Sequence, residues 1–372
     1  MLDTDEFADW FRLLESPGLG RDGVRRLLAA FGSPAAALRA SSAARRQVIG
    51  PRADTGIAEV PASFDQRLQQ ATHWWRAAPA RHVITLADAE YPPQLLRTPD
   101  PPLLLYVQGR LELLAAPGIA IVGSRNASAQ GMDNARAFAT HLSREHWCIV
   151  SGLAQGIDRA AHEGGLDGPG STLAVVGCGL DIVYPQRHRA LAQRIGQEGA
   201  VISEYAPGTP PLANNFPLRN RIIAGLSRGT LVVEAAVQSG SLITARVAAE
   251  CGREVFAVPG SIHSPLSRGC HALIRQGAKL VESAQDIVEE LRPTQPSVQP
   301  AAAAPENDAG SDAPAAADGL LQAMGHDPVT LDALGARSGW PVHVLSAKLL
   351  ELELAGAVER LPGGLYQRRS RA

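Results

Sequence analysis

The sequence lacks a strong charge of either sign and lacks the cysteine spacing of a metal or redox site. Its formal net charge is −2 over 372 residues, so a polyanion would have to bind a local patch rather than a uniformly basic surface. The cysteines fit no C-x-x-C pattern. Because each lies in or beside an apolar segment, we expect buried, reduced thiols. They are Cys148, Cys178, Cys251 and Cys270.

Long apolar runs and an export signal are also missing. No run approaches the roughly 20 apolar residues that a helix needs to cross a bilayer. The first residues, MLDTDEFADWFRLLE, are acidic and amphipathic, without the basic start and apolar core of a signal peptide. We therefore expect a cytoplasmic protein with no membrane partner.

Two nucleotide-binding motifs are absent as well. The segment from Gly123 to Gly131 is not G-x-G-x-x-G, and no acidic residue closes the second predicted strand of this region to hold a ribose. No G-x-x-x-x-G-K-[ST] segment exists, which argues against hydrolysis of nucleoside triphosphates. We expect neither a cofactor nor a metal. Aromatic residues make up only 5% of the chain, so an aromatic residue in a loop is informative.

The pattern at the N-terminal end predicts a helical domain over residues 1–80. Phe7, Trp10 and Phe11 fall on one helical face. The turn at residues 16–20 then leads into a second helix, as in a helix-hairpin-helix or SAM-like domain. The amides of such a hairpin can hold a phosphate. DNA contact and a structural or partner-binding role are both open for this domain.

The C-terminal part predicts a linker and a second small domain. Residues 293–318 are rich in proline and alanine and predict a flexible linker. Residues 319–372 predict helices followed by a hairpin, which together make a winged-helix domain. Its candidate recognition helix, residues 342–354, sets Lys348 against Glu351 and Glu353. That balance suits a phosphate backbone weakly, and many such domains contact only proteins.

Residues 81–292 alternate short apolar runs with helical stretches. The runs do not alternate with polar residues, which is typical of strands buried on both faces of a parallel sheet. The predicted fold class is therefore α/β, with a Rossmann-like, doubly wound parallel sheet between the two flanking domains. Residues 81–110 are expected to add strands to it. The seven runs are residues 119–122, 148–150, 173–176, 200–202, 231–233, 255–258 and 279–281.

The candidate site lies in the loops after these strands, because doubly wound sheets bind ligands at the carboxyl ends of their strands. Phe216 is followed closely by Arg219 and Arg221, and a small-residue turn at residues 239–241 opens the next helix. If the ring is exposed, this combination suits a phosphodiester chain with unstacked bases. From this stretch alone, it is equally possible that Phe216 is buried in the core and that the arginines form a solvated face. The candidate site residues in these loops are Gly123, Ser124, Arg125, Phe216, Arg219, Asn220, Arg221, Ser239, Gly240, Ser241 and Thr244.

Five segments of this region resemble the DNA-processing protein A (DprA/Smf) family of bacteria. They occur in the family's order, and the flanking domains fit the same architecture. The segments are IVGSR at 121–125, SGLAQGID at 151–158, GCGLD at 177–181, FPLRNRIIAGL at 216–226 and SGSLITA at 239–245.

The resemblance implies a binding protein rather than an enzyme. Members of the family bind single-stranded DNA that enters the cell during natural transformation, shield it, form homodimers through the Rossmann-like domain, and help to load the RecA recombinase. By similarity, Arg125, Phe216, Arg219 and Arg221 contact the strand, and the helix start at residues 239–244 holds a phosphate. Some relatives carry a lysine where this chain has Ala213, so one backbone contact is in doubt.

Two rival functions are open at this stage. Related Rossmann-like folds include phosphoribohydrolases, but their P-G-G-x-G-T segment is absent here and Glu234 precedes the small-residue turn. Asp158 and His162 could be an acid–base pair, but their i,i+4 spacing favours capping and packing of one helix over catalysis. His188 and His271 stand where the family has asparagine, and we expect structural roles for them. A transcription regulator would act through the winged helix, which the charge balance does not favour.

Overall fold

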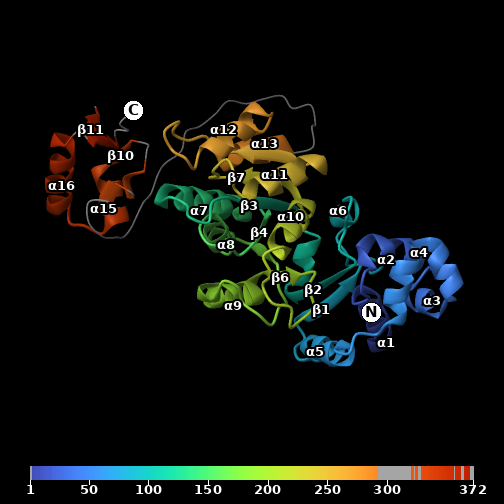
Figure 1. Cartoon of the computed structure of the whole chain (residues 1–372). Coiled ribbons are helices and arrows are strands. Elements are labelled where there is room, and N and C mark those ends of the chain that lie inside the picture. Colours follow the sequence, from blue (N-terminus) through green and yellow to red (C-terminus); the bar gives the residue numbers. More distant parts are fainter. Residues whose placement is uncertain are drawn as a thin grey trace.

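The structure is a computed structural model that describes residues 2–291, 320–321, 323–325, 328–355, 357–361 and 364–368. The predicted linker, residues 293–318, lies outside the described residues. The described chain forms an N-terminal helical unit, a nine-stranded sheet covered by helices on both faces, and a small C-terminal unit (Figure 1). Among the described residues, no helix is long and apolar enough to cross a membrane.

The predicted N-terminal helical domain is confirmed. Asp3 and Ser33 cap the first and third helices, each accepting a hydrogen bond from the amide three residues on. The hairpin after the first helix packs closely on the fourth helix. At Gly56 an added side chain would lie only 1.8 Å from the carbonyl oxygen of Pro17, so this approach requires glycine. The helices are α1 Thr4–Leu14, α2 Gly20–Phe31, α3 Pro34–Arg39, α4 Ser42–Ala58 and α5 Phe64–Arg76.

All seven predicted parallel strands are present, and the segment before them adds two more. The strand order is β1-β2-β6-β5-β4-β3-β7-β8-β9. Strands β1 and β2 pair antiparallel with each other, and β2 pairs antiparallel with β6. The strands are β1 Arg81–Thr85, β2 Leu104–Gly109, β3 Gly118–Val122, β4 Cys148–Ser151, β5 Thr172–Val176, β6 Ala200–Ser203, β7 Ser227–Val232, β8 Glu254–Ala257 and β9 Lys279–Leu280.

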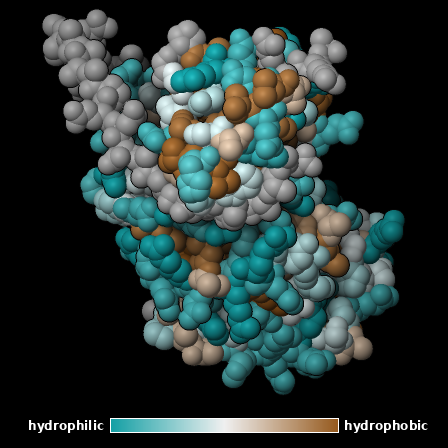
Figure 2. All heavy atoms as spheres, turned by 90° about the vertical axis from the view of Figure 1, so that its left-hand side faces the viewer, coloured by the Kyte–Doolittle hydropathy of each residue, from teal (hydrophilic) through white to brown (hydrophobic). Residues whose placement is uncertain are grey.

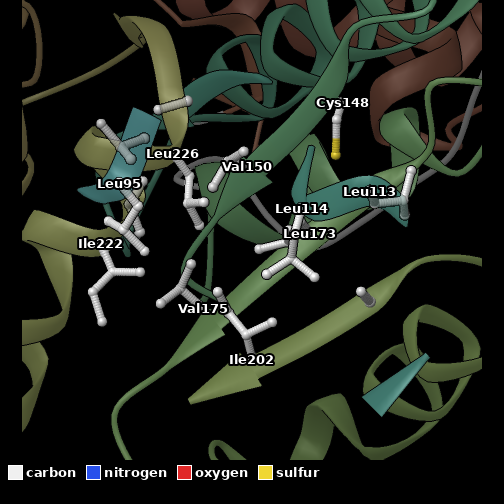
Figure 3. Close-up of a cluster of buried hydrophobic side chains, with 14 of the residues drawn as sticks. Leu95, Leu113, Leu114, Cys148, Val150, Leu173, Val175, Ile202, Ile222 and Leu226 are labelled. Carbon is white, nitrogen blue, oxygen red and sulfur yellow. The ribbon is translucent and has the colours of Figure 1, made fainter. Parts of the chain in front are cut away.

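Helices cover both faces of the sheet, which explains the continuous apolar runs of its central strands. On one face, side chains of β4, β5 and β6 meet those of α10 and α6 (Figure 3). On the other face, β3 and β4 pack against α7, α8 and α13. The helices are α6 Pro93–Leu96, η1 Leu111–Leu114, α7 Ala129–Arg144, α8 Ile157–Gly165, η2 Gln186–His188, α9 Arg189–Glu198, α10 Asn215–Leu226, α11 Ser241–Glu250, α12 Arg268–Arg275 and α13 Ala284–Leu291.

The helical unit and the sheet share an aromatic core. Tyr106 of β2 is fully buried, with its ring centroid 6.4 Å from that of Phe7 and 5.9 Å from that of Trp74. Such edge-to-face pairs stabilise beyond the area that they bury. The first strand begins at Arg81, where the sequence predicts the second domain to begin. The N-terminal helices therefore pack directly on the antiparallel end of the sheet.

The predicted winged-helix domain is also confirmed. Helices α15 and α16 pack over a three-stranded sheet of order β10-β12-β11, around a core that includes Leu334, Leu345 and Leu349. The predicted hairpin pairs residue 361 with residue 365. The elements are β10 Val329–Thr330, α15 Leu331–Ser338, α16 Val342–Leu354, β11 Val358–Leu361 and β12 Leu365–Arg368.

The four cysteines are free thiols, as expected. Cys148, Cys178 and Cys270 are buried, whereas Cys251 is half-buried at the end of α11. Burial raises the pKa of Cys148 to about 12 and that of Cys178 to about 11. These thiols therefore stay protonated at neutral pH and act as small apolar side chains.

Candidate nucleic-acid interface

The loops at the carboxyl edge of the sheet diverge beside β3, where the strand order reverses. From β3 the chain adds β4, β5 and β6 on one side, and then returns to β7 on the other. Open α/β sheets bind ligands at such a reversal. Here it holds a cavity of about 550 Å³. Every candidate residue except Arg221 lines this cavity: Gly123, Ser124, Arg125, Phe216, Arg219, Asn220, Ser239, Gly240, Ser241 and Thr244.

Arg125 extends from a loop whose backbone is fixed on both sides. The amide of Ser124 donates to the carbonyl of Glu234 at 2.7 Å, and the amide of Ile157 donates to the carbonyl of Ser124 at 3.2 Å. A side chain at Gly123 would come within 2.6 Å of Ile157, so this close approach requires glycine. The Arg125 side chain is exposed and forms no ion pair with any described residue.

Phe216 is half-buried at the start of α10, and its ring belongs to the cavity wall rather than to the core. A side chain at Gly177, after β5, would lie 3.3 Å from the ring. Asn215 secures the same contact, because its side-chain amide donates to the carbonyl of Gly177 at 3.0 Å. The guanidinium carbon of Arg125 lies 5.9 Å from the ring centroid, within cation–π range. Of the two open interpretations, the geometry supports the exposed one.

Arg219 lines the cavity but is already bonded to the protein. Its side chain is buried, and it donates to the carbonyl oxygens of Gly152, at 2.6 Å, and of Val175. A side chain at Gly152 would clash with this guanidinium at 2.3 Å. Arg219 therefore ties together the ends of β4 and β5. This placement corrects the expectation of a free fork that holds phosphate, although its charge still adds to the potential of the cavity.

Arg221 lies on the other side of α10, away from the cavity. Its guanidinium donates to Asp100 at 2.9 Å and to Glu204 at 2.6 Å. Arg21 and Arg25 of α2 bond the same Asp100 carboxylate. Successive helical residues are rotated by about 100°, so two positions apart means nearly opposite faces. The expected phosphate contact is thus replaced by an ion-pair network that joins the helical unit to the sheet.

The start of α11 forms the third wall of the cavity. Ser239 and Ser241 share a hydrogen bond between their hydroxyls at 2.7 Å. A side chain at Gly240 would meet nothing within 4 Å, so the turn is open above the helix N-terminus. The amides of such a start and the helix dipole favour an anion. Thr244 lines the cavity but is almost fully buried, so little of its surface can contact a ligand.

The candidate acid–base pair on α8 is used to hold the loop after β4. Asp158 accepts hydrogen bonds from the amides of Gly152 and Ala154, both at 3.2 Å. His162 accepts one from the amide of Leu153 through Nε2 at 3.2 Å. Burial lowers the pKa of His162 to about 3, with smaller effects of nearby positive groups. The imidazole is therefore neutral and packed, as the helix-packing interpretation predicts.

The two histidines that replace asparagine have structural contacts. His188 Nδ1 lies 3.0 Å from the carbonyl oxygen of Leu153, and His271 Nε2 lies 3.0 Å from that of Gly260. Each therefore closes a loop at the carboxyl edge. Ala213 is exposed on the segment before α10 and does not line the cavity.

Glu234 caps the helix that follows β3. Its carboxylate accepts hydrogen bonds from the amide of Ser128 at 2.9 Å and from the hydroxyl of Ser128 at 2.6 Å. A side chain at Gly131 would lie 2.4 Å from this carboxyl group. The glutamate thus packs tightly against the N-terminus of α7 and lies outside the main cavity.

One aromatic residue near the cavity was not predicted. Tyr184, in the loop after β5, is exposed, and its ring centroid lies 5.4 Å from that of Phe216. The available signal was the scarcity of aromatic residues together with the position of Tyr184 in a loop at the carboxyl edge. Sequence alone does not show that the loops after β5 and β6 meet.

The winged helix presents an apolar rather than a basic face. Helix α16 exposes Val342, Leu350 and Leu354, and Figure 2 shows hydrophobic side chains gathered on this part of the molecule. Lys348 pairs with Glu351 at 2.5 Å. An α16 that offers few free cations fits a phosphate backbone poorly, as its sequence predicts.

The fold defines a Rossmann-like α/β protein with helical and winged-helix domains at its two ends. Residues 82–292 match the family model of DNA recombination-mediator protein A, and residues 299–364 match that of the DprA winged helix domain. The chain belongs to the family of DNA recombination-mediator protein A. Protein Smf of Escherichia coli is 45% identical over 315 residues, which cover 83% of each chain. DNA processing protein DprA of Streptococcus pneumoniae is 46% identical over 246 residues, covering 66% of this chain and 87% of that one.

Two solved structures of family members are similar to this chain. That of DNA processing protein A from S. pneumoniae aligns with a TM-score of 0.68 and 39% identity, over 78% of this chain and 98% of the other. The second is DNA processing protein A from Helicobacter pylori, which was studied for its single-stranded DNA binding mode. It aligns with a TM-score of 0.52 and 30% identity, over 56% of this chain and 95% of the other.

Proposed function

We propose that this protein binds single-stranded DNA in the cavity at the carboxyl edge of its sheet. The observation that carries the proposal is the juxtaposition of three features around one cavity: the Arg125 guanidinium, which has no ion-pair partner among the described residues, the half-exposed Phe216 ring and the open start of α11. Arg125 and the helix start supply charge for phosphates. Phe216 supplies a face on which any base can stack, so binding is independent of sequence.

We infer a wider role from the family to which the chain belongs. The protein shields single-stranded DNA that enters the cytoplasm during natural transformation and helps to load a RecA-type recombinase on it, as a homodimer. Two observations support this role. The family model describes a recombination mediator, and the H. pylori relative was studied for its binding of single-stranded DNA.

The protein acts by binding and not as an enzyme. The rival function is hydrolysis of a nucleoside monophosphate, which requires a glutamate free to face the ligand. Glu234 is instead bonded to Ser128 at the start of α7, which supports the binding role. Release of free base from a nucleoside monophosphate, abolished in Glu234→Gln, would establish the rival function.

The proposal predicts that Phe216→Ala weakens binding of single-stranded DNA, although the substitution leaves the charge of the protein unchanged. The loss of one base–ring stack lowers affinity by about 5- to 150-fold. Gel shifts with matched single-stranded and duplex oligonucleotides measure this for wild type and variant. Leu218→Ala is the matched control, because Leu218 lies on the same helix, is 43% exposed and does not line the cavity. Equal affinity for both forms of DNA, unchanged in Phe216→Ala, would contradict the proposal.

A further inference from the structure

Tyr184 places a second exposed ring beside Phe216. The Tyr184 side chain is 48% exposed. Its ring centroid lies 5.4 Å from that of Phe216, with 44° between the ring planes. At this distance and tilt the two rings touch but do not cover each other's faces. The Tyr184 ring is therefore open to a flat ligand, while the half-buried Phe216 ring also has the Arg125 guanidinium near it.

The loop that carries Tyr184 is held in place at both ends. The amide of Ile182 donates to the carbonyl of Gly179 at 3.0 Å, and the carboxylate of Asp181 accepts from the amide of Gly208 at 2.8 Å. After Tyr184, the buried His188 ring bonds the carbonyl of Leu153 at 3.0 Å. The exposure of Tyr184 is thus a fixed feature of the surface, and little ordering is needed before a ligand binds.

The positions of these groups along the sheet give the site a direction. The start of α11 follows β7, Arg125 follows β3, and Tyr184 follows β5, in the spatial order β5-β4-β3-β7. The ring of Phe216 links the two: its centroid lies 5.4 Å from that of Tyr184 and 5.9 Å from the guanidinium carbon of Arg125. Phe216 therefore lies near both groups, and its ring is also close to the backbone of Gly177, where an added Cβ would lie 3.3 Å away.

We propose that Tyr184 is a second base-stacking residue, and that the strand runs along the carboxyl edge from α11 past Arg125 to the adjacent rings of Phe216 and Tyr184. This inference rests on the proposed function, namely that single-stranded DNA occupies the cavity. Two neighbouring bases of one strand then stack on the two rings, while the backbone lies against Arg125 and the α11 start. The rings define the end of the contacted segment on the β5 side.

A strand that carries very few bases tests this directly. One oligodeoxynucleotide is abasic except for a single thymine, and a second is abasic except for two adjacent thymines. Wild type should bind the second about 5- to 150-fold more tightly, because a further base finds a ring. Tyr184→Leu should lose this gain. Tyr184→Phe should keep it, because the aromatic face remains. The variants' thermal unfolding is compared with that of wild type to confirm that they are folded.

The outcomes separate this inference from the proposed function. If wild type binds neither an all-thymine strand nor the two-thymine strand, the proposed function fails. If wild type binds and Phe216→Ala weakens binding, but Tyr184→Leu retains the whole gain from the second thymine, then only the role of Tyr184 is overturned. A gain lost in Tyr184→Leu and kept in Tyr184→Phe supports the inference.

Discussion

The arginines near the carboxyl edge differ in what their guanidinium groups already contact. Arg219 donates to backbone carbonyls, and Arg221 donates to two carboxylates. Arg125 is exposed and has no carboxylate partner among the described residues. Since arginine keeps its charge at any physiological pH, Arg125 is the one of these three whose charge is available to a phosphate.

Arg125→Ala should therefore flatten the salt dependence of binding. Each phosphate that a cation neutralises on a single strand contributes about −0.7 to the slope of log K against log salt. We expect the slope to decrease in magnitude by about one such unit, together with a loss of affinity. Fluorescence titrations of a labelled oligothymidylate at several salt concentrations measure both quantities.

Arg228→Ala is the matched control for this experiment. Arg228 is also an exposed arginine beside an aromatic ring, with its guanidinium carbon 5.7 Å from the centroid of Trp147. It lies near the amino end of β7, at the opposite edge of the sheet. For Arg228→Ala, the slope of log K against log salt should equal that of wild type. An unchanged slope in Arg125→Ala as well would remove Arg125 from the site.

At the scale of elements, the strands were predictable and the orientation of α10 was not. Runs such as residues 119–122 and 173–176 are apolar on both faces, and burial on both faces is what a central parallel strand requires. The sequence also shows that Arg219 and Arg221 follow Phe216 closely. Only the observed helix α10, from residue 215 to residue 226, decides that the two arginines point in opposite directions.

Side chains of α8 hold the loop between β4 and α8 in place. Asp158 and His162 both reach back from α8 to amides of residues 152–154. His162 Nδ1 also lies 2.7 Å from the hydroxyl of Thr172 on β5. This unit forms the floor beneath Arg219, so the shape of the cavity depends on an imidazole that must stay neutral.

The protein should lose stability as the pH falls because of His162. Its pKa is lowered by burial to about 3 when folded, against about 6.5 when unfolded. The contribution is fully present above about pH 6.5, and it declines toward pH 3 because the unfolded chain binds the proton first. One proton corresponds to about 1.4 kcal/mol per pH unit. Urea unfolding at a series of pH values measures the decline.

His162→Gln should be less stable than wild type at pH 7.5 and should lose less stability on acidification. His141→Gln is the control, because His141 is exposed near the end of α7. Its acid decline should match that of wild type. If His162→Gln and wild type lose stability in parallel, His162 is not the group responsible.

At the scale of the whole molecule, an ion-pair network and a pair of exposed loops lie on different sides of the sheet domain. The network of Arg21, Asp100 and Arg221 joins the helical unit to the sheet, on the side of α10 away from the cavity. On the cavity side, loops 235–238 and 260–267 are joined by the amide of Ala235, which donates to the carbonyl of Leu266 at 2.6 Å. These loops expose Val237 at 61% and Ile262 at 74%.

We propose that Val237 and Ile262, each exposed on one of these two loops, belong to the surface of the proposed homodimer. Association would remove their apolar side chains from water, which is favourable. The residues on either side of Val237, Ala236 and Gln238, line the cavity. A dimer formed here brings two cavities close together, so one strand can engage both and bind more tightly than it binds either alone.

Ile262→Asp should therefore yield a monomer, because it places a charge in an apolar contact that excludes water. Light scattering after size exclusion gives the mass directly. Val60→Asp is the control, since Val60 is 59% exposed on the helical unit, and it should remain dimeric. The monomer should bind a strand that fills one cavity as well as wild type does, and should lose affinity only for longer strands. If Ile262→Asp remains dimeric, the dimer contact lies elsewhere. If wild type is monomeric, the proposed homodimer is wrong.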